Sequence, residues 1–597
     1  MNKHILLSGS LVLGALSLQS CLDYPDPGSE LTIDQSKSSL AVNQGNIDVI
    51  DYRKEISDSL FHDALKDLSS LIGTAKAGHF SLRGGKDGKT PVSHAYQFQY
   101  SLGVDAYAQY MVVPHKDFPY SQTTLTSSYN IAPKFNGGPR GGYTLVKNQL
   151  MPLLHHPKVE FLPELKAINL IYYCLAAQEM ADISGPFSYL EDKQNSTNPT
   201  TYNDLPTIYH GIVANLDTAV AALRYFDNRP DWYKKEMQEI LLNDVQTTRD
   251  LLVSKNTDVK TYIKLANSIK LRMAMRIVKV DPATAQRWAE EAVAAGVVES
   301  VDDQQGCFPA LLGFSHPLVE IATGWGDARM SASLESLLMS LEHPSTKYFF
   351  SKNSAEIENP RTKKVMKADS ALVGIRTGTF VVDGQAPGVN PYVRYSTVVA
   401  SELQNCPLYF VKYAEVCFLR AEGALRGWNM GGSAQSFYEE GIRNAYFEDP
   451  QDVQYTPYKT AIETYLKKEN ATPYVQRDPM GGEDWASLTK IGVKWNDADD
   501  LETKLEKIIT QKYIALFPLS TEAWAELRRT GYPKLFPVLN ADDGDGSIDQ
   551  GEMIRRVPWI PEDPKQIEIV NTSGLKALGG DDFQATRLWW DVNKGNF

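Results

Sequence analysis

Apolar residues recur at helical spacing along most of the chain after residue 160, and the helices that they predict come in pairs. In one pair, Phe410, Cys417 and Ala421 share one helical face. Gly427 then suits the left-handed turn past a helix end, and Ser433 can cap the next helix. The pattern predicts four helical hairpins: 165–183 with 207–223, 262–278 with 282–295, 409–426 with 433–446, and 501–517 with 521–529.

The spacing of these pairs is similar to tetratricopeptide-like units, although it is too irregular for a regular solenoid. An earlier apolar stripe from Ser57 to Leu71 predicts one more helix. Two glycine clusters, at 83–90 and 137–142, predict loops. The first cluster nearly matches a phosphate loop, but its first glycine, Gly84, stands one position late, which favours a surface turn.

Residues 300–405 form the longest irregular stretch, rich in Gly, Pro and polar residues and in aromatic rings. Loops on a rigid scaffold are where binding residues collect. An amphipathic aromatic ring can stack on a sugar face while neighbouring polar groups bond to its hydroxyls, and packing inside the protein is the alternative for each ring. The candidate ligand-binding residues are Trp325, Arg376, Tyr392 and Tyr395.

The first twenty residues have the order of a secretory signal. Lys3 supplies a positive start and an apolar run follows from Ile5 to Leu18, too short to span a bilayer by itself. Ser20 and Cys21 close the run as a bacterial lipobox does, which predicts cleavage after residue 20 and acylation of Cys21. The alternative is an ordinary cleaved signal with an incidental cysteine.

Composition and charge then narrow the classes of partner. The chain is 43% hydrophobic and 22% charged, as expected of a folded protein, and its formal net charge is −13. An acidic balance argues against nucleic acid and anionic lipid surfaces as partners. No later apolar run reaches the roughly 20 residues of a membrane span, so we expect a soluble body. Cys307 and Cys406 offer one pairing, but a chain of this size does not need a disulfide.

The motifs of hydrolytic enzymes are missing from the sequence: it has neither His-Glu-x-x-His nor Gly-x-Ser-x-Gly. Glu415 and Glu422 lie two helical turns apart, which would suit a pair of catalytic carboxylates. Ion pairing with Arg420, Arg426 or a neighbouring helix is the favoured interpretation. We expect no catalytic residues, and a secreted glycoside hydrolase, with two carboxyl groups across a cleft, stays open as the less favoured alternative.

One acidic stretch, residues 541–552, resembles a calcium loop. It matches an EF-hand at six positions, with Gly546 at the sharp turn, but Ala541 stands where the first carboxylate belongs. The two interpretations are a weak or non-standard Ca²⁺ site and a solvated acidic turn. No cofactor is otherwise required. The candidate ligands are Asp543, Asp545, Ser547, Asp549 and Glu552.

Several motifs along the chain resemble the signature of SusD/RagB-type lipoproteins. The segments Lys512 to Phe517, Glu522 to Pro533 and the ending Trp589-Trp590-Asp591 carry the resemblance most clearly. Phe187-Ser188-Tyr189 and Trp559 depart from the usual pattern. Further matches lie at 266–272, 374–378, 413–416, 420–422 and 555–562, so the resemblance runs from the lipobox to the C-terminus.

The resemblance implies a mostly α-helical, SusD-like fold in which residues 21–597 form a single domain on four tetratricopeptide-like hairpins. It also implies a lipid anchor in the outer membrane, facing the extracellular side, and partnership with a SusC-like TonB-dependent transporter. Acidic Asp23 and Asp26 resemble the export signals of some Bacteroidetes lipoproteins. Ligands of the family are usually glycans, and peptides in some members.

Overall fold

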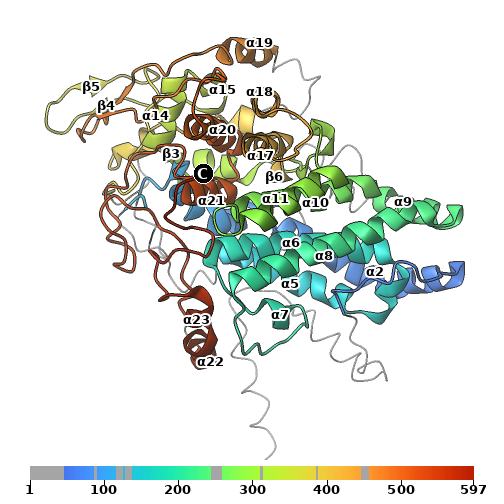
Figure 1. Ribbon diagram of the computed structural model, residues 1–597. Coiled ribbons are helices and arrows are strands. Elements are labelled where there is room, and N and C mark those ends of the chain that lie inside the picture. The colour runs from blue at the N-terminus through green and yellow to red at the C-terminus, as the bar shows by residue number, and fades with distance from the viewer. Residues whose placement is uncertain are drawn as a thin grey trace, which may run out of the picture.

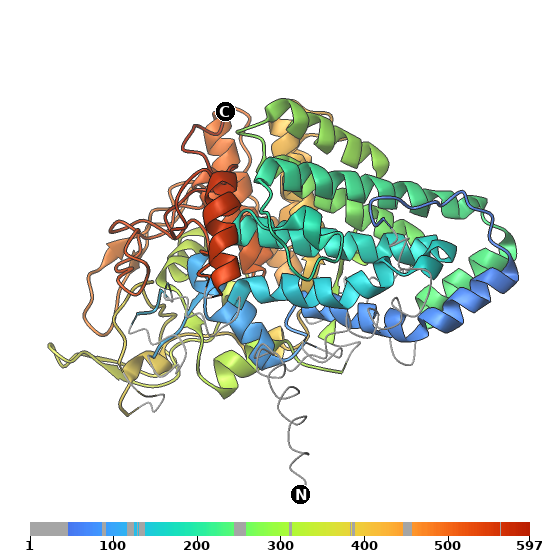
Figure 2. The same ribbon diagram turned by 90° about the horizontal axis from the view of Figure 1, so that it is seen from below.

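The computed structural model describes residues 46–85, 91–115, 125–127, 129, 138–243, 258–309, 313–382, 384, 388–445, 456–561 and 563–597. The predicted signal segment and Cys21 lie outside these ranges. Within them the protein has a helical array and a loop-rich part, which lie side by side in Figures 1 and 2.

The four predicted hairpins are confirmed, because the two helices of each pair pack against each other. Neighbouring pairs also touch, so the helices form one continuous array (Figure 1). The pairs are α6 (Pro163–Ser184) with α8 (Leu205–Arg224), α10 (Val259–Arg276) with α11 (Pro282–Ala295), α17 (Tyr413–Leu425) with α18 (Ala434–Arg443), and α20 (Leu501–Leu516) with α21 (Ser520–Thr530).

A repeated Asp-x-x-Thr capping motif starts four of these eight helices. In each case the aspartate carboxylate accepts a hydrogen bond from the threonine backbone N–H, at 2.7–3.1 Å. Such a cap contributes about 1 kcal/mol and fixes where the helix begins. The pairs are Asp204 with Thr207, Asp258 with Thr261, Asp281 with Thr284, and Asp500 with Thr503.

A fifth helix pair was only half predicted from the sequence. The helix expected at 57–71 continues as α2 (Asp58–Ser81) and packs on α5 (Gly141–Leu154). The loop prediction for 137–142 is therefore wrong at its end, where α5 begins at Gly141. Packing overrides the low helix propensity of glycine here. A Cβ at Gly78 would lie 3.1 Å from the Cβ of Gln149, so Gly78 allows α2 to approach α5 closely.

A second boundary also differs from the prediction. The third hairpin was expected to begin with a helix at residue 409, but β6 (Leu408–Val411) comes first and pairs with β2 (Gln305–Cys307). The helix α17 starts two residues later, at Tyr413. All four residues of β6 are buried, and such a short apolar run does not distinguish a strand from a helix.

The loop-rich part contains very short antiparallel pairs of strands around one helix. β1 (Met111–Val112) pairs with β3 (Arg329–Met330), β4 (Ile357–Glu358) with β5 (Val365–Met366), and β7 (Val475–Gln476) with β8 (Trp485–Ala486). The helix α14 (Ala332–Leu341) lies among them (Figure 1). The part is thus assembled from more than the 300–405 segment, since the β7–β8 hairpin joins it from far along the chain.

The remaining helices are short or peripheral. They are α3 (Ser93–Tyr96), α4 (Val104–Tyr107), α7 (Tyr189–Asp192), α9 (Asp231–Asn243), α13 (Pro317–Val319), α15 (Thr346–Phe349), α16 (Ala400–Leu403), α19 (Thr456–Tyr465), α22 (Pro564–Ile569) and α23 (Leu575–Leu578). Within the described ranges, no helix combines the length and the apolar composition needed to cross a membrane.

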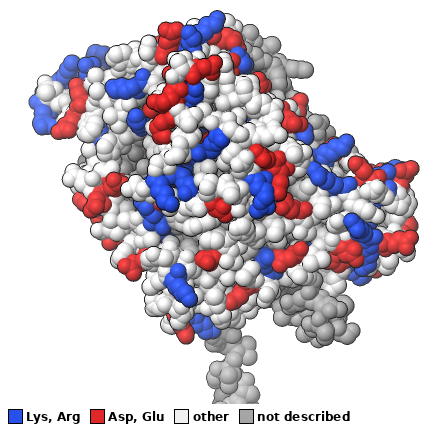
Figure 3. Space-filling model, in the orientation of Figure 1, with Lys and Arg blue, Asp and Glu red and all other residues white. Residues whose placement is uncertain are grey.

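One large hydrophobic core runs from Ile47 to Trp590 and includes both helices of every pair. A second, small core lies under the loop-rich part and contains Ile357, Ile375 and Tyr395. Cys307 and Cys406 are both buried free thiols. Lys, Arg, Asp and Glu are interspersed over the face shown in Figure 3 and form no continuous field of one sign there.

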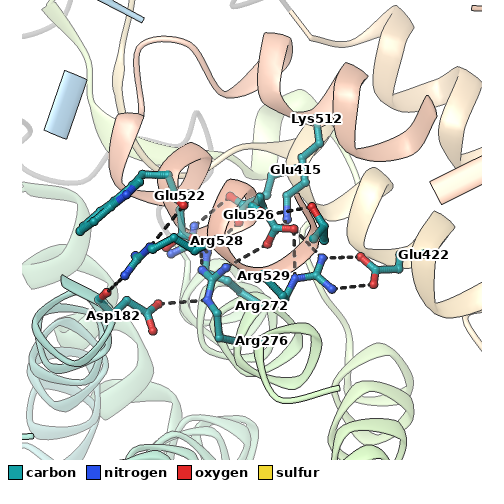
Figure 4. Close-up of polar contacts among 12 residues, drawn as sticks. Asp182, Arg272, Arg276, Glu415, Glu422, Lys512, Glu522, Glu526, Arg528 and Arg529 are labelled. Atoms are coloured by element: carbon teal, nitrogen blue, oxygen red, sulfur yellow. Dashed lines mark hydrogen bonds and ion pairs between the residues drawn. The ribbon is translucent and has the colours of Figure 1, made fainter. Parts of the chain in front are cut away.

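A network of buried charges joins the helices α6, α10, α17, α20 and α21 (Figure 4). Arg272 of α10 donates two hydrogen bonds, of 2.7 and 2.8 Å, to the carboxylate of Glu415 of α17. Arg529 of α21 binds Glu422 in the same way, at 2.7 and 2.6 Å. Arg276 reaches three carboxylates, and Lys512 lies 3.3 Å from one of them; these carboxylates are Asp182, Glu522 and Glu526.

The network explains the residues on which the family resemblance rests. The matched segments around 266–272, 413–422, 512–517 and 522–533 all contribute to it, although they lie far apart in sequence. Positive charge nearby holds the pKa of Glu522 low, at about 2, despite its burial. These four segments thus hold the helices in register, whereas the matched segment 374–378 lies in the loop-rich part.

Candidate ligand-binding site

The clearest candidate site centres on a half-buried tryptophan in the loop-rich part. The guanidinium carbon of Arg376 lies 4.2 Å from the centroid of the Trp485 ring and 4.9 Å from that of Phe536. Arg376 also donates from Nη2 to the carbonyl oxygen of Pro537 at 2.9 Å. The arginine therefore braces the Trp485 ring in a fixed orientation.

Burial lowers the pKa of Arg376 to about 10, so its guanidinium stays charged at neutral pH. The exposed Glu483 is the nearby carboxylate that opposes this shift. A fixed cation behind one face of an indole makes that ring a rigid platform. Because Trp485 is only half-buried, part of it remains open to solvent.

The platform borders a cavity of about 340 Å³. Phe536 connects the platform with the cavity. It lines the cavity, and its ring centroid lies 5.8 Å from that of Trp485, at an interplanar angle of 63°. Leu527, Val538 and Met553 give the cavity an apolar lining, and Lys490 and Lys534 are exposed lining residues. An apolar hollow with a few polar groups beside a braced ring is a geometry that holds small ligands.

The β7–β8 hairpin positions Trp485. Gln476 and Trp485 are partners across the two strands, and the Ser487 amide donates to the Tyr474 carbonyl at 2.8 Å. Gln476 is buried and its side chain donates to the Gly374 carbonyl at 3.3 Å. This bond ties the hairpin to the segment that carries Arg376.

Two of the predicted aromatic residues lie together next to this hairpin. The ring centroids of Tyr392 and Tyr395 are 5.3 Å apart. Tyr395 is only 1% exposed, and its hydroxyl donates to Asp478 of the hairpin. Burial raises the pKa of Tyr395, so the hydroxyl stays protonated and keeps this bond. The buried Tyr395 thus holds the β7–β8 hairpin through Asp478, whereas Tyr392 is half-buried.

Three of the four predicted ligand residues lie around the β7–β8 hairpin. Arg376 lies at the platform, and Tyr392 and Tyr395 lie together, with Tyr395 bonded to Asp478 of the same hairpin. Trp325 is half-buried against the large hydrophobic core, at the end of the π-helical turn Glu320–Gly324. In the part of the chain that the structure describes, no hydrogen bond or ring contact joins Trp325 to the other three residues.

Trp485, Phe536 and Asp478 were not predicted from the sequence, because they lie outside the irregular stretch 300–405. One signal was available for Trp485: it follows the polar run Gly481-Gly482-Glu483-Asp484, where no apolar periodicity explains a large ring. No comparable signal marked Phe536 or Asp478. Their contacts with distant segments arise only in the folded chain.

Glu415 and Glu422 do not form a catalytic pair. Arg272 engages the first, and Arg426 and Arg529 engage the second, all in the core. The expected ion pairing with Arg426 and with neighbouring helices is confirmed. Arg420, the other partner considered, instead donates to the Met430 carbonyl and lies over the ring of Phe437.

Several side chains of the acidic loop 541–552 bond within the protein. Asp545 accepts hydrogen bonds from the backbone N–H and the hydroxyl of Ser547 and from the backbone N–H of Gln584. Asp543 accepts from Ser127, and Glu552 lies 3.2 Å from Arg555. In the described parts of the chain, no three His, Cys, Asp or Glu side chains converge as metal ligands would. The calcium site, including Asp549, stays a prediction.

Comparison with known proteins places this architecture in a family. The model of the SusD-like family, described as SusD and RagB outer membrane lipoprotein, matches residues 55–591. The chain therefore belongs to the SusD-like family, whose members are outer-membrane lipoproteins with this helical fold. No curated protein matches the sequence.

Solved structures agree with this assignment. A chitin-binding SusD homologue from Flavobacterium johnsoniae is 30% identical with a TM-score of 0.70, over 88% of this chain and 100% of that one. A SusD homologue from Bacteroides vulgatus is 27% identical with a TM-score of 0.72, over 90% and 100%. One from Bacteroides thetaiotaomicron is 26% identical with a TM-score of 0.68, over 88% and 99%.

Proposed function

We propose that this protein binds oligosaccharide or polysaccharide nutrients at the outer-membrane surface and delivers them to a SusC-like TonB-dependent transporter, without catalysing a reaction. The observation that carries the proposal is the Trp485 ring, held by Arg376 beside a cavity of about 340 Å³. A pre-oriented ring stacks on a sugar face with little loss of conformational entropy.

The ligand class is supported by the family and by the chitin-binding relative, which is 30% identical. Chitin oligosaccharides are therefore the first ligands to test. A binding screen should use the lipid-free protein against chitin oligosaccharides, a panel of other polysaccharides, and peptides. Retention by at least one glycan supports the proposal. Binding of peptides alone would instead support the role of a peptide-capturing, RagB-like protein.

The absence of catalysis needs its own test. After prolonged incubation of the protein with a retained glycan, we expect no new reducing ends. Release of shorter sugars at a steady rate would support the glycoside hydrolase alternative. The engagement of Glu415 and Glu422 by arginines in the core favours binding over hydrolysis.

The anchor and the transporter rest on sequence and on family membership. We expect a Cys21→Ser variant to lose fatty-acid labelling and to leave the membrane fraction. Surface proteolysis of intact cells should degrade the wild-type protein if it faces outward. Affinity purification of the anchored protein should recover a TonB-dependent barrel, and its consistent absence would count against the delivery role.

A further inference from the structure

We propose that Glu335 is the positioning residue of the candidate site: its carboxyl group joins the segment that carries Arg376 to the hairpin that carries Trp485, and its ionisation loosens this joint. This inference rests on the proposed function, because it concerns the same platform. It concerns a residue that contributes no ring or cation to the platform itself.

The joint begins at the N-terminus of α14. Ser331 caps this helix, and the amide of Ala332 donates to the Ile375 carbonyl at 2.8 Å. Gly374 lies directly against this turn, since a Cβ on it would come within 2.4 Å of the Ser331 carbonyl oxygen. This close approach brings the Gly374 amide to 2.6 Å from Oε2 of Glu335.

The other carboxyl oxygen reaches the hairpin. The hydroxyl of Tyr474, the residue immediately before β7, hydrogen-bonds to Oε1 of Glu335. Glu335 is 1% exposed, so its contacts with Gly374 and Tyr474, and its hydrogen bond with the Gln476 side chain of β7, are shielded from water. A single side chain therefore connects Gly374, two residues before Arg376, with Tyr474, whose carbonyl is bound by Ser487, two residues after Trp485.

Among the described residues, no lysine, arginine or histidine forms an ion pair with the Glu335 carboxyl group. The ionisable groups on the elements packed against it are Tyr474 and Asp478 of the hairpin and Arg376 of the neighbouring segment. Arg376 is directed at Trp485 and Phe536. On α14's own side, Glu342 lies at the exposed helix end, bound to Lys468 and Thr472. Burial, with Asp478 adding to it, raises the pKa of Glu335 to about 7.

The direction of the pH effect follows from this shift. In the closed joint Glu335 loses its proton near pH 7, whereas a solvent-exposed glutamate in the open joint would lose it at about 4.3. Raising the pH from 5 to 7 therefore favours the open joint, and the effect levels off above the folded pKa. The ratio of open to closed joints should rise on the order of tenfold or more over this window.

Three variants test the joint. Glu335→Gln keeps the size and neutral hydrogen bonding of the protonated side chain but cannot ionise. Glu335→Ala removes the contacts with Gly374, Tyr474 and Gln476. Glu358→Gln is the matched control, since Glu358 is exposed in the same part of the protein and pairs with Lys363. The readout is hydrogen exchange of the 472–488 amides, corrected for the intrinsic pH dependence of exchange, which needs no ligand.

We expect exchange of these amides to accelerate between pH 5 and 7 in the wild type and in Glu358→Gln, and to stay flat in Glu335→Gln. Glu335→Ala should exchange faster at every pH, and affinity for a retained glycan should follow the same order. A wild-type pH response in Glu335→Gln, or full protection in Glu335→Ala, would overturn the inference. If hydrogen exchange follows the expected pattern but no glycan binds, the proposed function is wrong while the positioning role of Glu335 is supported.

Discussion

The helical array and the loop-rich part hold their buried charges in opposite ways. In the charge network of the array, Arg272 meets Glu415, Arg276 meets three carboxylates and Arg529 meets Glu422, whereas Arg528 lies over the rings of Trp524 and Trp590. In the loop-rich part, Arg376 meets aromatic rings, and its Nε has no hydrogen-bond acceptor among the described residues. The comparison indicates that the first arrangement serves the stability of the fold, while the second gives up pairing to orient a ring near the surface.

The largest expected effect breaks the network in the array. Arg272→Met should lower the free energy of unfolding by about 3–5 kcal/mol, because Glu415 is left as an unpaired buried charge. Urea denaturation measures this change. As a control, Lys367→Ala removes an exposed ion pair with Glu356 and should change stability by less than about 1 kcal/mol. Equal effects of the two variants would contradict the assigned role of the network.

The next effect concerns the brace behind Trp485. Arg376→Lys keeps the charge but removes the planar group that stacks on the ring. We expect glycan affinity to fall about tenfold, which corresponds to about 1.4 kcal/mol of binding free energy. The free energy of unfolding should change by much less. Titration calorimetry with a retained glycan measures the affinity. An unchanged affinity would show that stacking of the Arg376 guanidinium on Trp485 is not needed for glycan binding.

A smaller effect is expected below the platform. Tyr395→Phe removes one hydrogen bond to Asp478 and should cost about 1 kcal/mol of stability. Because Tyr395 is buried, its substitution should affect glycan affinity only by loosening the β7–β8 hairpin. We therefore expect a smaller loss of glycan affinity than for Arg376→Lys. A larger loss of affinity than in that variant would show that the tyrosine hydroxyl contacts ligand directly.

The smallest effect concerns calcium. A weak site in 541–552 predicts a measurable heat when protein stripped by a chelator is titrated with millimolar Ca²⁺, and loss of that heat in Glu552→Gln. Asp542→Asn, in the same loop but outside the candidate ligand set, is the matched control. No heat from the wild type would leave the loop as a solvated acidic turn.

Much of the fold could be predicted from the sequence, because helix pairing depends on local patterns. Apolar stripes, the Ser433 cap and the helix-ending Gly427 are read from neighbouring residues, and these patterns predicted the four hairpins within a few positions. The start of α5 at Gly141 could not be read this way, since its packing on α2 decides it.

The candidate site was harder to predict because its parts are distant in sequence. Arg376 was named for its motif, but its partners Trp485 and Phe536 lie more than 100 residues away. An aromatic residue in a loop also does not reveal its burial: Tyr395 and Tyr392 are three residues apart, and only the second is half-exposed. Burial on this side depends on long-range contacts such as that between Tyr395 and Asp478.

The most direct test compares two tryptophans. Trp485→Ala removes the proposed platform, and Trp495→Ala removes a half-buried ring that packs on Tyr438 in the helical array. In affinity electrophoresis with a retained glycan, we predict that Trp485→Ala weakens retention by about 30-fold, or 2 kcal/mol, while Trp495→Ala binds as the wild type does. Undiminished retention of Trp485→Ala, or equal losses in both variants, would contradict the proposed site.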